Sequence, residues 1–171
     1  MIRLIVLLVP LFFFTLLQNA LAQYPERPIK LIVPFAPAGT VDGVARLFAN
    51  EYAKFLGQAV VVENKAGSGG AVGILASINS PADGYTLLLG NIATASAPAL
   101  YPKMGINLKL LDPITLIGRS AYVLVVRNDF APKNLNELIS TLKANPGKFN
   151  YASAGAGSAI HLAAELFKSK A

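Results

Sequence analysis

The sequence predicts an α/β fold built on a doubly wound, mainly parallel β-sheet, and three observations support this prediction. Short apolar runs rich in β-branched residues alternate with segments in which apolar residues recur at helical spacing. Short connections containing glycine and proline separate these segments. The clearest unit, from Arg27 to Gly73, joins a strand, a turn, a helix and a second strand, and such units place their strands in parallel.

This first unit contains the most informative turn of the chain. The apolar run from Ile29 to Phe35 is typical of a buried strand, and Pro37 and Gly39 interrupt it. Apolar residues then recur at helical spacing: Val44, Ala45, Leu47, Phe48, Tyr52 and Phe55. A tight turn from strand to helix exposes the unpaired N–H groups of the helix start, so the turn from Ala36 to Asp42 is expected to hold a carboxylate or phosphate.

The same alternation continues along the chain. The elements expected next are a strand at 59–63, a Gly-rich turn at 66–70, a helix at 72–78, a turn at 81–84, a strand at 85–89 and a helix at 93–100. A second group comprises apolar strand-like segments at 114–117 and 122–126, a helix at 135–144, a strand at 149–152, a turn at 153–157 and a helix at 159–170. Because the later strand, turn and helix resemble the first, we expect a second α/β lobe to begin near Tyr122.

Residues 1–22 are predicted to be a secretory signal peptide. Arg3 precedes an apolar run from Leu4 to Leu17, and the small-x-small sequence Ala20-Leu21-Ala22 offers a cleavage site before Gln23. The alternative is a membrane anchor, but the run is shorter than the about 20 apolar residues that a span usually needs. We therefore expect an exported protein.

Composition excludes several classes of function. The chain has no cysteine, so disulfides, thiol catalysis and cysteine-based metal sites are excluded. Its formal net charge is +6, but the basic residues are scattered, which favours a generally basic surface over a nucleic-acid groove. The glycines from Gly67 to Gly73 do not match the spacing of a dinucleotide-binding fingerprint, and we expect no cofactor.

Several ordered motifs together make the chain resemble the Bug family of periplasmic substrate-binding proteins, which serve tripartite tricarboxylate transporters (TctC-like proteins). The motifs are YPERPIKLIVPFAPAG with the following Asp42, LGQAVVVENKAGSGGAVG, PADGYTLLLGN and KFNYASAGAGSAIHLAAELF. The resemblance implies a type II, Venus-flytrap protein of two lobes that closes on a small organic carboxylate. It also implies that residues 23–121 form an incomplete first lobe and residues 122–171 the start of a second, truncated one.

The resemblance further implies that one loop from each lobe grips the ligand carboxylate, with a third contribution after the 85–89 strand. By motif, these candidate ligand-binding residues are Phe35, Ala36, Pro37, Ala38, Gly39, Thr40, Asp42, Asn91, Thr94, Ser153, Ala154, Gly155, Gly157, Ser158 and His161. Relatives commonly have consecutive glycines where this chain has Ala38-Gly39, and a methyl at Ala38 restricts φ.

Each prominent polar residue among these also has a structural interpretation. Asp42 suits an N-cap or the first turn of a helix, and Ser158 has the signature of an N-cap. His161, the single histidine, has no partners for a catalytic triad or metal site, which favours a structural role. No arrangement of catalytic residues emerges, so we expect no enzyme.

The leading hypothesis is therefore a periplasmic solute-binding protein that passes a di- or tricarboxylate, or a related acid, to the membrane subunits of a tripartite tricarboxylate-type transporter, and is monomeric when complete. One alternative is a non-functional truncated product, since the last helix lacks a C-cap signal and the second lobe has too few strands to close a core. A ligand-sensing protein that feeds a signalling partner is a further alternative, and an exported α/β enzyme is disfavoured.

Overall fold

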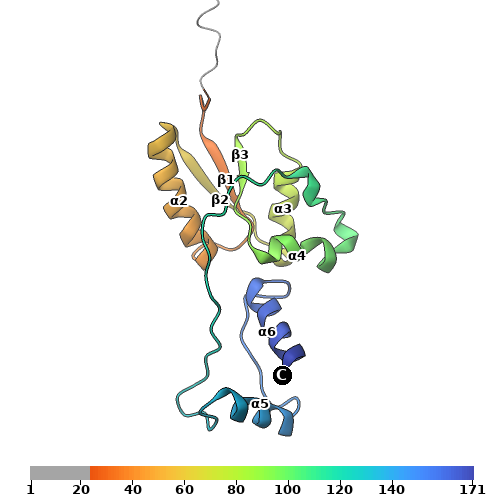
Figure 1. The fold of residues 1–171 in the computed structure, drawn as a ribbon. Coiled ribbons are helices and arrows are strands. Elements are labelled where there is room, and N and C mark those ends of the chain that lie inside the picture. The colour runs from red at the N-terminus through yellow and green to blue at the C-terminus, as the bar shows by residue number, and fades with distance from the viewer. Residues whose placement is uncertain (1–23) are drawn as a thin grey trace, which may run out of the picture.

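The computed structural model describes residues 24–171, and the predicted signal peptide lies outside them. The strands of the described part are β1 (Ile29–Val33), β2 (Val60–Asn64) and β3 (Thr86–Leu88). The α-helices are α2 (Thr40–Leu56), α3 (Ala71–Ile78), α4 (Ile92–Leu100), α5 (Leu135–Ala144) and α6 (Ala159–Lys170), and the short 3₁₀ turns are η1 (Ser68–Gly70), η2 (Pro102–Met104) and η3 (Leu108–Leu110) (Figure 1). None of these helices is long and apolar enough to cross a membrane.

The sheet is parallel, in the order β2-β1-β3. Leu31 at its centre is in register with Val62 on one side and Leu87 on the other. Four of the five β1 residues are buried, and only Lys30 reaches solvent. A nearly continuous apolar run is what a central parallel strand requires, because helices cover both of its faces.

Helices lie on both faces of this sheet. On one face, Leu31 and Val33 pack against Ala45 and Ala49 of α2. On the other face, α3 and α4 form a second core with Ala71, Ile74, Ala97 and Ile106, against which Leu88 of β3 packs. Figure 1 shows α2 and α3 on opposite sides of the strands. The predicted doubly wound, parallel α/β arrangement is confirmed for this part of the chain.

Helix α3 approaches the end of β1 very closely. A Cβ added to Gly73 would lie 2.7 Å from Pro34 Cα and 2.9 Å from the Lys65 carbonyl oxygen. These are main-chain atoms that follow β1 and β2, so the helix rests directly on the sheet edge where the two strands end. Glycine at this position is what permits the contact.

The second group of predicted elements is only partly formed. Helices α5 and α6 have the predicted bounds, with Asn134 and Ser158 as their N-caps. The strands predicted at 114–117, 122–126 and 149–152 are wrong, because none of these segments joins a sheet in the described structure. Successive residues of a strand face opposite sides of a sheet, so a sheet with one covered face would bury one of two neighbours. Here both neighbours are exposed, Val123 at 79% and Leu124 at 61%. Apolar patterning favours a strand, but a strand forms only where hydrogen-bonding partners lie beside it.

We expect this exposed segment to make the purified chain self-associate, because extended apolar segments with unpaired backbone groups pair with one another. Replacing Val123 and Val125 with lysine should shift the chain toward the monomer in sedimentation or light-scattering measurements. The control adds the same charge elsewhere, at the exposed Ser140 and Ser169. Equal suppression of association by both double variants would show that net charge, and not this segment, is responsible.

Candidate functional site

The turns that follow the three strands open at one edge of the sheet. The strands are parallel and end at Val33, Asn64 and Leu88. Their carboxyl ends therefore share an edge, which is where open α/β sheets bind ligands. The first and third of these turns carry predicted site residues, and the second is the Gly-rich turn at 67–70.

The first predicted loop leads into α2, whose start is not capped by a side chain. Gly39 is the N-cap residue, and α2 begins at Thr40. Residues 36–40 are exposed. The first N–H groups of this 17-residue helix therefore face solvent beside the strand ends, where the helix dipole favours an anion.

Asp42 lies in the first turn of α2 but is not its cap. Its carboxylate is buried and accepts hydrogen bonds from the Ala38 N–H at 2.9 Å, from Arg46 Nε at 2.9 Å and Nη2 at 3.0 Å, and from Asn64 Nδ2 at 2.9 Å. Asn64 Nδ2 also donates to the Phe35 carbonyl oxygen at 3.1 Å. Both ends of the loop from Phe35 to Ala38 are thus tied to one carboxylate and one amide.

This network also explains how the chain accommodates Ala38 where relatives commonly have glycine. Ala38 adopts a φ of 64°, in the left-handed region that disfavours a residue with a Cβ. The hydrogen bond from its N–H to Asp42 holds it in that conformation. The methyl group of Ala38 is therefore tolerated because the hydrogen bond to Asp42 compensates for the backbone strain at Ala38.

Hydrogen bonds from Arg46, and then from Asn64 and Ala38, lower the pKa of Asp42 from its ordinary 3.8 to about 2. Because the folded state favours the ionised form, this carboxylate stabilises the fold above its ordinary pKa, and the stabilisation is lost as the pH falls through about 2.

We therefore expect the difference in unfolding free energy between the native chain and Asp42→Asn to shrink as the pH falls from about 5 to 2. Urea denaturation across that range measures the difference, and subtraction removes the contribution of the other carboxylates. A difference that does not vary with pH would contradict this account.

The third predicted contribution, Asn91 and Thr94, forms the cap of α4. Asn91 Oδ1 accepts from the Ala93 N–H at 2.9 Å, and Thr94 Oγ1 accepts from the Asn91 N–H at 3.2 Å. This reciprocal pair is a capping box, which stabilises the start of α4.

The loop before α6 is also held by its own side chains. Ser158 Oγ accepts from the His161 N–H at 3.3 Å, so the N-cap interpretation of Ser158 is confirmed. His161 Nδ1 accepts from the Gly157 N–H at 3.2 Å, which confirms a structural contact for His161. Ser153 Oγ accepts from the Gly155 N–H at 3.2 Å. The lone histidine therefore shapes the loop that precedes it.

Sequence reasoning missed three contributors to this region: Arg46, Asn64 and the turn at 67–70. The turn at 67–70 links the two predicted loops, since a Cβ on Gly70 would lie 3.5 Å from the Phe35 ring and one on Gly69 would lie 2.9 Å from the Ala156 carbonyl oxygen. The available signal was position: Asn64 ends the parallel strand β2, and the turn at 67–70 follows that strand.

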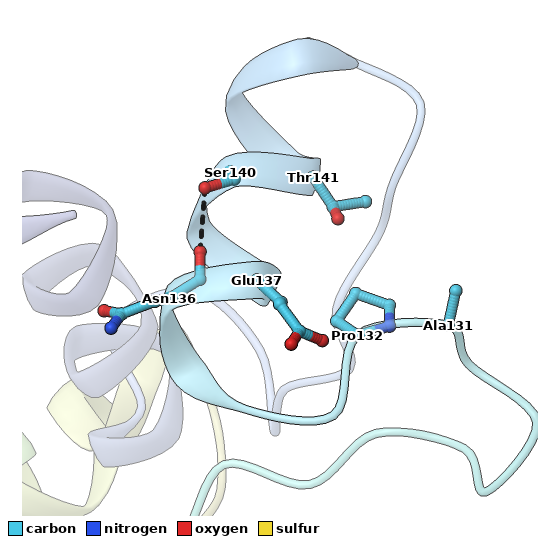
Figure 2. A pocket seen from close by; sticks show the side chains of 6 residues that line it. All are labelled: Ala131, Pro132, Asn136, Glu137, Ser140 and Thr141. Atoms are coloured by element: carbon cyan, nitrogen blue, oxygen red, sulfur yellow. Dashed lines mark hydrogen bonds between the residues drawn. The ribbon is translucent and has the colours of Figure 1, made fainter.

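An open hollow of about 420 Å³ lies elsewhere, on α5 (Figure 2). Its lining residues are Ala131, Pro132, Asn136, Glu137, Ser140 and Thr141. Two of the polar side chains bond locally, with Ser140 Oγ donating to the Asn136 carbonyl oxygen and Glu137 accepting from the Lys133 N–H. None of the predicted site residues lines it, and the described part of the chain has no cluster of side chains suited to a metal ion.

Comparison with known families and curated proteins places these features in context. The family model described as "Tripartite tricarboxylate transporter family receptor" matches residues 44–171. A UPF0065 protein of Bordetella pertussis is 44% identical over 147 residues, covering 85% of this chain and 46% of that protein. Protein BugT of the same organism is 42% identical over 148 residues, covering 85% and 45%. The chain thus spans about half the length of the curated relatives it matches.

Solved structures that resemble the chain include a periplasmic binding protein and proteins with bound carboxylates, and the chain again spans half of each. The periplasmic binding protein BugD is 38% identical, with a TM-score of 0.72 over 86% of this chain and 50% of that one. MatC from Rhodopseudomonas palustris, solved with bound malate, is 34% identical, with a TM-score of 0.78 over 85% and 50%. An R. palustris protein solved with adipate is 33% identical, with a TM-score of 0.76 over 85% and 50%. The predicted periplasmic binding protein-like fold is therefore confirmed.

Proposed function

The chain belongs to the tripartite tricarboxylate transporter receptor family, and from this premise we propose that it is the carboxylate-gripping part of a periplasmic solute-binding protein. The observation that carries the proposal is the uncapped, exposed start of α2 at the carboxyl edge of the sheet. Two structural neighbours hold adipate and malate, both dicarboxylates, which supports the same chemical class of ligand.

The proposed recognition of the anion uses backbone N–H groups and hydroxyls rather than a basic side chain. Arg46 is the cation nearest to this loop along the chain, and its guanidinium is paired with the Asp42 carboxylate. The charge of Arg46 is therefore balanced within the protein. Gly39, Thr40 and Val41 remain to present N–H groups at the helix start, and Thr40 adds a hydroxyl.

The two predicted lobes, 23–121 and 122–171, each supply one gripping loop in this proposal. Phe35 to Asp42 belongs to the first, and Ser153 to Ser158 with His161 to the second. Asn91 and Thr94 would line the site from the start of α4, where their side chains form its cap. A ligand held by both loops favours the arrangement in which they face each other, which is the physical basis of closure.

We extend the proposal to cellular context through the family. Residues 1–22 act as a signal peptide for export to the periplasm, the whole protein is a monomer, and its partners are the membrane subunits of a tripartite tricarboxylate-type transporter. The protein binds its ligand without catalysing a reaction. BugD, named a periplasmic binding protein, supports this assignment.

Titration of the ¹⁵N-labelled chain with malate and with adipate tests the site. We expect the amide resonances of Gly39, Thr40 and Val41 to shift progressively, together with those at the start of α6. Malamide, the neutral diamide of malate, is the control because it keeps the shape and removes the charge. Equal shifts with malate and malamide, or no shift at Gly39 to Val41, would refute the proposal.

A further inference from the structure

The start of α6 is seated on the first lobe at a small, well-defined contact. Gly157, Ser158 and Ala159 are buried, whereas Ala156 and Ile160 on either side are exposed. The structure shows why, since α6 contacts α4 and its leading turn lies against the end of that helix (Figure 1). The burial is therefore local to the point where the second predicted loop meets the first lobe.

Two glycines make this contact possible. A Cβ on Gly157 would lie 2.9 Å from the Tyr101 hydroxyl and 3.3 Å from Leu100 Cδ1. A Cβ on Gly69 would lie 2.9 Å from the same hydroxyl and 2.9 Å from the Ala156 carbonyl oxygen. The two main chains and the tyrosine hydroxyl thus meet so closely that a Cβ added at either glycine would force one of these groups to move.

Tyr101 provides the polar contact at this place. Its hydroxyl donates to the Ala156 carbonyl oxygen at 3.1 Å. The residue is the C-cap of α4, its N–H donates to the Ala97 carbonyl oxygen at 2.9 Å, and its ring packs against the second core, which contains Ile74. The first lobe therefore holds Tyr101 through its main chain and its ring, and the hydroxyl extends to the loop before α6.

We propose that Tyr101 is a positioning residue that docks the loop of residues 153–158 onto the first lobe, with Gly69 and Gly157 providing the space. The docking itself is a property of the ligand-free chain. Its consequence, that Tyr101 determines how the two carboxylate-binding loops face each other, rests on the proposed function.

The absence of cysteine from the chain allows a direct test with two spin labels. Ala99→Cys on α4 and Ser169→Cys on α6 are exposed positions on the two sides of the contact. Without ligand, the doubly labelled native chain is expected to give one narrow distance distribution. A broad distribution in the native chain would overturn the proposal.

Matched glycine variants separate contact from backbone strain. Gly157 and Gly147 have φ values of 78° and 75°, and an added Cβ meets nothing within 4 Å at Gly147. Gly157→Ala should lose the narrow distribution and Gly147→Ala should keep it. Gly69→Ala and Gly105→Ala form a second pair, with φ values of 60° and 64° and open space at Gly105. If both members of each pair behave alike, strain explains the effect and the proposal fails.

Tyr101→Phe tests the hydroxyl alone. We expect it to broaden the distance distribution and to weaken malate binding several-fold, while the midpoint of thermal unfolding stays the same. An unchanged distribution would overturn the positioning role even if malate still shifted the amides of Gly39 to Val41. If the variants change the distance distribution as expected but malate shifts no amide resonance, the proposed function is refuted. The positioning role of Tyr101 then remains in place.

Discussion

Replacing Gly39 with aspartate is expected to reduce the affinity of the chain for malate at least tenfold, which corresponds to about 1.4 kcal/mol of binding free energy. Gly39 is the N-cap of α2 and offers no side chain to the free N–H groups. An aspartate there accepts hydrogen bonds from the same groups and adds a like charge where the ligand carboxylate binds. Isothermal calorimetry or the amide titration measures the loss.

Gly39→Ala is the matched control for this prediction. A Cβ at Gly39 would meet only the Ala36 carbonyl oxygen, at an ordinary contact distance of 3.5 Å, and φ is −78°. Alanine therefore fits the backbone and leaves the N–H groups free, so this variant should retain most of the affinity. If alanine and aspartate abolish binding equally, space at this position matters rather than the free N–H groups. Unchanged affinity in Gly39→Asp would remove the helix start from the site.

The largest expected effect on stability is that of Gly73→Ala, which should destabilise the fold by about 2 kcal/mol or more. The new methyl group would lie 2.7 Å from Pro34 Cα and 2.9 Å from the Lys65 carbonyl oxygen. Both neighbours are main-chain atoms at the ends of strands, so neither can move without disturbing the sheet. Urea denaturation followed by circular dichroism measures the change.

Gly43→Ala provides the comparison, because Gly43 is also helical but an added Cβ meets nothing within 4 Å. Alanine should stabilise α2 there by about 0.5–1 kcal/mol, since glycine is a poor helix former. Opposite signs at Gly73 and Gly43 are the expected result. If Gly73→Ala stabilises the chain as Gly43→Ala does, α3 does not rest on the strand ends as described.

Much of the part of the chain that contains the sheet, from β1 to α4, was predictable because its elements are specified locally. The run from Ile29 to Phe35 is apolar, Gly and Pro follow it, and the apolar spacing of α2 has one interpretation. The helices α5 and α6 were predicted with their observed bounds, since N-cap residues mark both starts. The segment at 122–126 has equally clear strand patterning, yet it forms no strand, because pairing depends on neighbours that patterning does not supply.

The loops of the candidate site could be named from the sequence, but the side-chain contacts that hold those loops could not. The turn from Ala36 to Asp42 was found because a strand, a turn and a helix start follow one another in the sequence. The roles of the individual side chains were harder to predict from the sequence. Asp42 was expected to serve as a cap or first-turn acid, and it is a first-turn acid of α2. Its bonds to the Ala38 N–H and to Asn64 of β2 were not foreseen.

The sequence by itself determined the order of strands and helices from β1 to α4, the family and the loops that follow β1 and precede α6, because these depend on residues close together in the chain. Only the tertiary structure decided which distant groups support those loops. Asn64 reaches Asp42 across 22 residues because β2 lies beside β1, and Tyr101 reaches Ala156 across 55 residues because α6 is seated on the end of α4. Such contacts arise from packing rather than from local preference, so no periodicity or motif in the sequence encodes them directly.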